Sequence, residues 1–233
     1  MTDRPINRRT LASQRSALWL DYYATPEADV AARAAIMAKI SELDWQIHSA
    51  RLGIPPRLLD ARLHRDATQA TDAVKVVRDY CEGEMARGHC LVLSGPAGVG
   101  KSYAAVAALH TAIVRHYRIG FFYFPTLCTA LLDSVRRPAA LDCAKESAVV
   151  TFDDFGAEYT KQGGGFLATL VEEIIWHREG HNLPTLVTTN LTADQLRERC
   201  SDRIVDRLRG SWGRVVELPG ASLRGTEGDD AHA

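Results

Sequence analysis

The stretch GPAGVGKS at residues 95–102 decides the fold of this chain. It fits the pattern G-x-x-x-x-G-K-[ST] in full, and its residues are Gly95, Pro96, Ala97, Gly98, Val99, Gly100, Lys101 and Ser102. The glycines let consecutive backbone N–H groups converge on a phosphate, and a helix that follows the loop adds its positive N-terminal end. We expect Lys101 to reach the outer phosphates of ATP and the Ser102 hydroxyl to coordinate Mg²⁺. The sequence therefore predicts an ATP-binding loop between a strand and a helix.

Two acids after an apolar run supply the second half of this site. Residues 148–152 read AVVTF and are followed by Asp153 and Asp154. In open α/β sheets, ligands bind beyond the carboxyl ends of the strands, where these acids would lie. We expect Asp153 to hold the metal ion and Asp154 to orient or deprotonate the attacking water. Such a pair alone is a weak signal, but after a complete phosphate-binding loop it becomes a strong one.

The chain beyond the loop alternates short apolar runs with longer helical patterns. The strands that we predict are residues 90–94, 121–124, 148–152, 184–189 and 214–218. This alternation indicates an α/β fold of the P-loop NTPase type, with a mostly parallel five-stranded sheet flanked by helices. Asn190 follows the fourth strand, and two roles remain open for it. It could hold the lytic water or the γ-phosphate, or it could cap the helix that starts near Thr192.

The N-terminal part has a different character. Residues 11–23 predict a short helix, and Thr25, Pro26 and Glu27 resemble the start of a second helix. The second helix has an apolar face formed by Ile36, Ile40, Leu43 and Ile47. The double proline in LGIPPRLLDARL ends this helix and begins a connector. We expect a helical extension at residues 1–50, a linker at 51–68, the ATPase domain at 69–224 and a disordered tail at 225–233.

The composition narrows the class of protein. The 233 residues include 28 basic and 29 acidic side chains, so nucleic-acid binding would need a local basic patch. No segment has the long apolar run that a bilayer crossing requires, and the default expectation is a cytoplasmic protein. The five cysteines are widely spaced and form no C-x-x-C pair, which disfavours zinc and a disulfide framework. We expect several of them to be buried thiols.

The motifs, taken in order, resemble a known family. The series GPAGVGKS, VVTFDDFGAE, TLVTTN, SDRIVDRLRGS and SLR looks like the AAA+ ATPases of the DnaC-type replicative helicase loaders, a DnaC/IstB-like family with phage-encoded members. The similarity covers residues 50–224, and the connector also resembles that family's linker. This resemblance implies that Arg203 is an arginine finger acting on a neighbouring subunit, that Asn190 is sensor 1, and that Arg224 acts near the nucleotide.

The resemblance also implies an activity and partners. With ATP bound, such a protein would oligomerise, bind single-stranded DNA and deliver the replicative hexameric helicase, which residues 1–50 would contact. Many AAA+ proteins have Glu where this chain has Asp154, which implies slow hydrolysis of ATP to ADP and phosphate, stimulated by oligomerisation or DNA. Single strands are held by cations and stacking aromatics. The candidates here are Phe124, Arg207, and the pair Arg136 and Arg137 at the end of a helix that we expect over residues 127–137. Their alternative roles are a core aromatic and solvated helix surface.

Three other functions remain open at this point. An IstB-type transposition helper has the same motifs but acts on duplex DNA. A small-molecule P-loop kinase would also use Lys101, Ser102 and Asp153, although we find no arginine-rich lid for it. An assembly module that binds ATP and barely hydrolyses it is the third.

Overall fold

The computed structural model of the chain describes residues 8–63, 71–156, 165–220 and 222–223. The strands are β1 (Cys90–Ser94), β2 (Ile119–Tyr123), β3 (Val149–Asp153), β4 (Thr185–Thr189) and β5 (Gly213–Glu217). The longer helices are α1 (Arg8–Ala24), α2 (Val30–Leu52), α4 (Lys101–Val114), α6 (Arg137–Glu146) and α7 (Gly165–Gly180). Shorter helical segments are η1 (Pro56–Leu58), α3 (Asp72–Asp79), η2 (Tyr80–Glu84), η3 (Met85–Arg87), α5 (Phe124–Leu132), α8 (Ala193–Arg199) and α9 (Asp202–Arg209).

The five strands form one parallel sheet in the order β2-β3-β4-β1-β5. This confirms the predicted fold class, and each strand lies within two residues of its predicted range. β1, β3 and β4 are buried at every position, as expected of strands that are covered on both faces. The strand order brings the ends of β1, β3 and β4 together at the carboxyl edge of the sheet.

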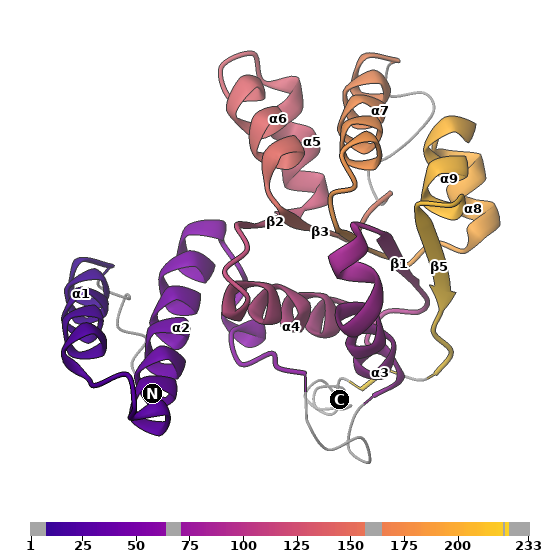
Figure 1. The fold of residues 1–233 in the computed structure, drawn as a ribbon. Coiled ribbons are helices and arrows are strands. Elements are labelled where there is room, and N and C mark those ends of the chain that lie inside the picture. The colour runs from indigo at the N-terminus through magenta and orange to yellow at the C-terminus, as the bar shows by residue number, and fades with distance from the viewer. Residues whose placement is uncertain (1–7, 64–70, 157–164, 221, 224–233) are drawn as a thin grey trace, which may run out of the picture.

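Helices cover both faces of the sheet (Figure 1). Alternate residues of β1 point to opposite faces, so Leu91 and Leu93 join one core cluster while Cys90 and Val92 join the other. The first cluster includes α3 and α4, and the second includes α5, α7 and α9. α4, the helix that follows the phosphate-binding loop, is therefore fixed against the sheet.

A buried arginine joins three elements at the amino edge of the sheet. Arg178 of α7 is 0% exposed. Its guanidinium donates to the backbone carbonyls of Ala144, Lys145, Ser147 and Pro184, and to the Thr185 hydroxyl, at 2.8–3.1 Å. The first three carbonyls lie at the end of α6 and before β3, and the other two groups lie at the start of β4. Arg178 thus fixes the point at which these strands enter the sheet.

The N-terminal helices form a pair, but the second begins later than predicted. α2 begins at Val30, and the Asp29 side chain caps it by accepting the Ala32 N–H at 3.0 Å. The Thr25 hydroxyl instead donates backwards to the Asp21 carbonyl at the end of α1. The expectation that Thr25 starts the helix is therefore wrong, because Thr25 completes the preceding turn and leaves the capping position to Asp29.

The buried side of α2 also differs in part from the expected apolar stripe. Ile40 is fully buried, whereas Ile36, Leu43 and Ile47 are only partly so. Trp45 is buried as well and belongs to the same core cluster as α4. The indole N–H of Trp45 donates to the Leu59 carbonyl at 2.8 Å, which ties α2 to the connector.

The connector packs into the main core. The double proline ends α2 as predicted: the helix stops at Leu52, and Gly53 takes the left-handed conformation at φ 68°. Ile54, Leu58 and Ala61 are buried in the cluster that contains α4. Residues 64–68 of the predicted linker and the predicted tail at 225–233 lie outside the described residues, and the predicted domain limits stay predictions.

Four of the five cysteines are buried in the core. Cys81, Cys90, Cys128 and Cys200 are buried thiols, and Cys143 is exposed. Burial raises the pKa of Cys81 to about 12 and raises that of Cys90 further.

In the described part of the chain, no helix combines the length and the apolar character needed to cross a membrane.

Candidate nucleotide-binding site

The phosphate-binding loop connects β1 to α4, as the sequence predicts. Gly95, Gly98 and Gly100 have φ values of 146°, 90° and 92°, which side chains with a Cβ rarely adopt. A Cβ on Gly95 would collide with the Leu218 carbonyl, and one on Gly98 would collide with the Ser222 side chain. These glycines therefore provide both the tight loop and the close approach of the C-terminal segment, where the Leu223 N–H donates to the Gly98 carbonyl at 2.9 Å.

Lys101 lies at the centre of the site and is 6% exposed. Its ammonium donates to the carbonyls of Gly95 and Pro96, each at 2.7 Å, and to the side-chain oxygen of Asn190 at 2.9 Å. A buried ammonium needs such partners because burial removes its hydration. These oxygens hold the lysine at the mouth of the loop, where a phosphate could replace some of them.

The two acids lie on the neighbouring strand, across the pocket from the loop. Asp153 is the last residue of β3 and accepts the Thr188 hydroxyl at 2.7 Å. The same hydroxyl accepts the backbone N–H of Asp154 at 3.0 Å. Asp154 has φ 62°, a left-handed conformation that Asp tolerates better than most residues. Thr188 of β4 thus fixes both the carboxylate of Asp153 and the backbone of Asp154.

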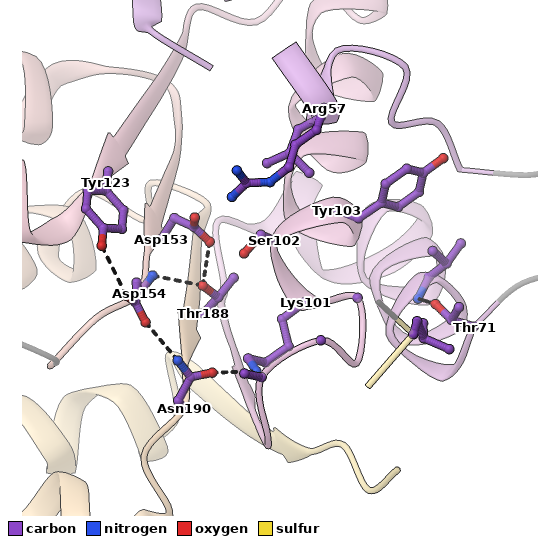
Figure 2. A pocket seen from close by; sticks show the side chains of 16 residues that line it. Arg57, Thr71, Lys101, Ser102, Tyr103, Tyr123, Asp153, Asp154, Thr188 and Asn190 are labelled. Atoms are coloured by element: carbon purple, nitrogen blue, oxygen red, sulfur yellow. Dashed lines mark hydrogen bonds between the residues drawn. The ribbon is translucent and has the colours of Figure 1, made fainter. Parts of the chain in front are cut away.

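Asn190 connects the two halves of the site (Figure 2). Its side-chain NH₂ donates to Asp154 at 3.0 Å, while its oxygen accepts from Lys101. The helix-cap alternative is wrong, because Thr192 caps α8 through a complete capping box with Gln195. Asn190 is therefore free of that task and lies between the lysine and the acid.

The pocket around these groups has a volume of about 610 Å³, within the range of ligand sites. Its lining comprises Arg57, Leu58, Thr71, Val74, Ala97, Gly98, Gly100, Lys101, Ser102, Tyr103, Tyr123, Asp153, Asp154, Thr188, Asn190 and Leu223. Apolar side chains from the connector, α3 and the C-terminal segment thus share one pocket with the cation and the acids. This combination suits a ligand with an apolar base and a charged phosphate chain.

The donor set fits magnesium. Ser102 and Asp153 offer hard oxygen ligands in the same pocket, and Mg²⁺ usually binds one or two carboxylates together with substrate phosphates. Within the described residues, no group of three or more His, Cys, Asp or Glu could hold a metal ion by itself. The residues present therefore suit a metal that arrives with a nucleotide.

Comparison with known sequences finds distant relatives of this chain. No protein-family model matches the chain. The replicative helicase loader DnaI of Bacillus subtilis is 26% identical over 117 residues, which cover 49% of this chain and 37% of DnaI. A protein named as an insertion sequence ATP-binding protein, y4uH of Sinorhizobium fredii, is 28% identical over 202 residues, 78% of this chain and 77% of that protein.

Comparison with solved structures agrees. The crystal structure of DnaI has a TM-score of 0.61 at 26% identity, covering 73% of this chain and 94% of that one. The DnaC helicase loader has a TM-score of 0.58 at 23% identity, covering 71% of this chain and all of that one (100%). DnaA bound to AMPPCP and single-stranded DNA has a TM-score of 0.60 at 18% identity, covering 72% of this chain and 51% of that one.

The chain is thus similar to the DnaC/IstB-like AAA+ ATPases. The fold, the phosphate-binding loop and the acid pair are those expected of this ATP-binding family. The sequence match to DnaI spans little more than a third (37%) of that loader.

The predicted arginine finger lies away from the nucleotide pocket of its own chain. Arg203 is near the start of α9, its side chain is 82% exposed, and its guanidinium is 3.8 Å from Glu172 of α7. It does not line the pocket that holds Lys101. Arg224, predicted to act near the nucleotide, lies outside the described residues.

Among the DNA-binding candidates, the structure corrects Phe124. Phe124 is 1% exposed and packs against Phe152 and Phe155, so it is a core aromatic and not a stacking platform. Arg207 is half-buried and forms an ion pair with Glu179, and its role in DNA binding stays a prediction.

The helix expected at residues 127–137 is also wrong, because it is two helices. α5 ends at Leu132, and the Asp133 carboxylate accepts the N–H groups of Val135 and Arg136. Arg136 is exposed and pairs with Asp133 at 2.9 Å. Arg137 places its guanidinium 4.7 Å from the Phe166 ring centre. These two arginines stay candidates for a DNA surface.

Two pocket residues were missed by the sequence reasoning. Tyr123 ends β2, and its hydroxyl is 3.4 Å from the Asp154 carboxylate, to which it donates. Its place at a strand end was the signal that could have found it. Arg57 enters the pocket from the connector, and no spacing or motif in the sequence indicates that approach.

Proposed function

We propose that this protein is an ATP-dependent helicase loader, which hydrolyses ATP slowly and acts in the cytoplasm. In the ATP state it would oligomerise, bind single-stranded DNA and deliver a replicative hexameric helicase. The proposal is supported most strongly by the hydrogen-bonded series Lys101–Asn190–Asp154. In this series Asn190, which would sense the γ-phosphate, is bonded to Asp154, the acid that would act on water. The likeness to the helicase loaders DnaI and DnaC supports the biological role.

The residues of the site have distinct roles in this proposal. The backbone N–H groups of residues 97–102 and the Lys101 ammonium would bind the phosphates, and Ser102 and Asp153 would hold Mg²⁺. When bound, Mg²⁺ would neutralise charge on the phosphate oxygens. Asp154 would accept a proton from water, and the bond from the Asn190 amide at 3.0 Å keeps its carboxylate oriented.

Arg203 would complete the site of a neighbouring subunit. Its exposure on α9 and its absence from its own pocket support action in trans. An arginine stabilises the negative charge that develops on the transferred phosphoryl group, so hydrolysis would depend on assembly. An ATPase rate per subunit that stayed constant as protein concentration rose would contradict this role.

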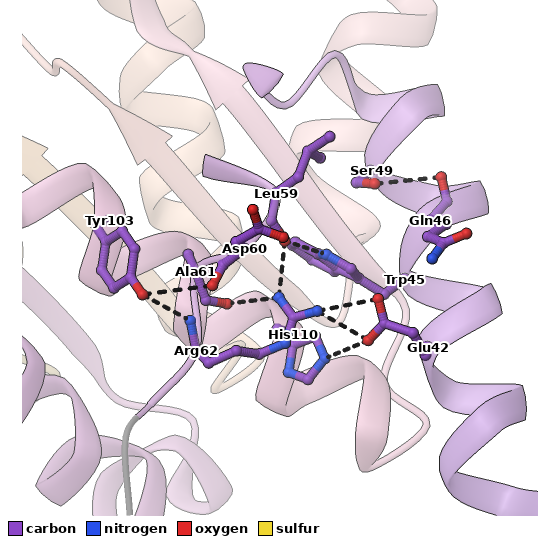
Figure 3. Close-up of polar contacts among 10 residues, drawn as sticks. All are labelled: Glu42, Trp45, Gln46, Ser49, Leu59, Asp60, Ala61, Arg62, Tyr103 and His110. Atoms are coloured by element: carbon purple, nitrogen blue, oxygen red, sulfur yellow. Dashed lines mark hydrogen bonds and ion pairs between the residues drawn. The ribbon is translucent and has the colours of Figure 1, made fainter. Parts of the chain in front are cut away.

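The N-terminal helices would report the nucleotide state to the helicase. A polar joint connects α2, the connector and α4 (Figure 3). The Arg62 guanidinium donates to both carboxylate oxygens of Glu42 at 2.9 and 3.1 Å, and also to the Leu59 carbonyl. The Tyr103 hydroxyl, on the helix that begins with Lys101, is 3.4 Å from the Arg62 N–H. This continuity supports residues 1–50 as the helicase-contacting part.

Co-purification with a replicative helicase tests the loader. We expect the full chain with ATP to retain the helicase, and a chain lacking residues 1–50 to lose it while still binding ATP. Retention by the shortened chain would contradict the assignment of the N-terminal helices. No retention by the full chain with any candidate helicase would contradict the loader function itself.

A transposition helper is the second candidate, because the match to y4uH covers more of this chain than the match to DnaI. The two functions differ in the DNA they require. Affinities for single-stranded and duplex DNA, measured with ATP at one stated salt concentration, separate them, since phosphate contacts dominate both. A clear preference for duplex DNA would favour the helper over the loader.

A further inference from the structure

The connector brings a cation into the nucleotide pocket that no motif assigns. Arg57 lies in the short helical turn η1, directly after Pro55 and Pro56. The Leu58 N–H donates to the Pro55 carbonyl at 2.8 Å, and the Leu59 N–H to the Pro56 carbonyl at 3.1 Å. Proline rings fix φ, so this turn has little conformational freedom. The backbone of Arg57 is therefore held in place before any ligand binds.

The residues on both sides of Arg57 anchor the turn. Ile54 and Leu58 are buried in the cluster that also contains α4. The Leu59 carbonyl accepts from the Trp45 indole and from Arg62, each at 2.8 Å. The apolar neighbours thus face the core, and the Arg57 side chain points into the pocket that also holds Ser102 and Asp153 (Figure 2).

Arg57 differs from other arginines of this region in its partners. Arg62, five residues further on, is fully engaged with Glu42 and two backbone carbonyls. Arg57 has no ion pair or hydrogen bond to any residue in the described ranges, although Asp153 and Asp154 line the same pocket. A guanidinium held at a distance from these carboxylates leaves room for a ligand between them.

The charges of the pocket indicate which ligand that is. Lys101 and Arg57 supply two positive charges, and Asp153 and Asp154 supply two negative ones. An ATP–Mg²⁺ complex adds net negative charge, and Lys101 alone would have to balance it on the protein side. A guanidinium offers five donors in a planar fork that matches phosphate oxygens. We propose that Arg57 binds the phosphate chain of the nucleotide from within the same subunit, an inference that rests on the proposed ATP-binding function.

This role would give the connector a direct contact with the nucleotide. The turn that holds Arg57 also provides the carbonyl that anchors Trp45 of α2. Nucleotide binding would thus act directly on the connector, which holds the N-terminal helices. Arg57 differs in this from Arg203, which would reach the nucleotide of another subunit.

Equilibrium binding of a fluorescent ATP analogue to the full chain tests the role of Arg57. We expect R57A to weaken binding by about 10- to 100-fold, the usual effect of losing a charge-assisted hydrogen bond. R57K should recover much of that loss, because it restores the charge without the planar fork. The matched control is R51A, which removes an exposed arginine at the end of α2 that lies outside this pocket, and it should bind like the wild type.

The thermal melting temperature of each variant and the K101A variant separate the possible outcomes. Unchanged melting of R57A with weak binding, rescued by R57K, supports the contact with phosphate. Wild-type affinity in R57A, while K101A loses the nucleotide, would overturn the role of Arg57 and leave the proposed function intact. If the wild type itself failed to bind the analogue, both proposals would fall. Equal weakening by R57A and R51A would also overturn the role, since it would reflect general charge alone.

Discussion

The two edges of the parallel sheet each hold a buried cation, and they use it differently. At the amino edge, Arg178 donates to four backbone carbonyls and a hydroxyl, and no nucleotide-pocket residue is among them. At the carboxyl edge, Lys101 donates to two carbonyls and to Asn190 inside a pocket of about 610 Å³. The acceptors of all these hydrogen bonds are neutral oxygens.

The difference lies in what can replace those oxygens. Around Arg178 the partners are four backbone carbonyls and the Thr185 hydroxyl, all at the ends of packed elements, and exchanging them would require the sheet and helices to separate. Around Lys101 the partners belong to a loop and a side chain that line an open pocket, where a phosphate can compete for the ammonium. One cation is therefore expected to hold the fold, and the other to exchange partners when a ligand binds.

Replacing Arg178 gives the largest expected effect on this comparison. R178M keeps the side-chain length but removes the guanidinium donor from four carbonyls, of which only that of Pro184 keeps a backbone donor in the described contacts, the Val150 N–H at 3.2 Å. Breaking such a buried charged network costs about 3–5 kcal/mol in the free energy of unfolding, a large part of the stability of a typical domain. Urea unfolding followed by circular dichroism measures it.

A matched control for R178M is available on the surface. R197M removes an exposed arginine of α8 that forms a surface ion pair with Asp194 at 3.2 Å. We expect a change within about 0.5 kcal/mol. If R178M unfolded with a free energy within about 1 kcal/mol of the wild type, the amino edge would not depend on its cation.

Replacing Lys101 should affect nucleotide binding strongly and the free energy of unfolding only slightly, which is the opposite of a structural role. We expect K101M to weaken nucleotide binding by about 100-fold, because it removes a charged donor to the phosphates. The free energy of unfolding should change by less than about 1 kcal/mol, because water entering the pocket can satisfy the released oxygens. Isothermal titration with ATP and urea unfolding of the same preparation provide the two measurements. A loss of stability as large as that of R178M would mean that Lys101 is structural.

The same contrast explains what the sequence could predict. The loop at residues 95–102 and the acids Asp153 and Asp154 follow strands, and their roles come from local spacing. The parallel sheet brings these strand ends together, so the prediction of a joint site is confirmed by one pocket. Arg178, by contrast, looks like any polar residue near the end of a helix. Its burial is decided by the packing of α6, β3 and β4, which no local pattern contains.

Other errors have the same origin. Phe124 follows β2 and begins α5, and only the packing of Phe152 and Phe155 around its ring shows that it is core. The late start of α2 depends on a choice between two good caps, Thr25 and Asp29, and the turn at the end of α1 takes the first. Arg57 reaches the pocket because the connector packs on α4, a contact between segments far apart in sequence.

A third basic group extends the comparison, because burial leaves it uncharged. His110 of α4 lies at the joint with α2, where its ring packs edge-on against Trp45 and its Nε2 is 3.7 Å from Glu42. Burial, aided by the charge of Arg62, lowers the pKa of His110 to about 4, although Glu42 pulls it upward. At neutral pH the contact with Glu42 is therefore not an ion pair.

The smallest expected effect is the pH dependence that follows from His110. An unfolded histidine takes up a proton near pH 6.5, whereas the folded one resists until about pH 4. The unfolded state thus binds more protons between these values, and this contribution to stability is complete above pH 6.5 and lost as the pH falls toward 4. Urea unfolding at pH 7 and pH 5 should show the wild type losing about 1 kcal/mol more than H110Q. In contrast, H116N, which replaces an exposed histidine at φ 63° with a residue that tolerates that conformation, should keep the wild-type difference. If H110Q and the wild type lost the same stability between the two pH values, His110 would not be held neutral at the joint.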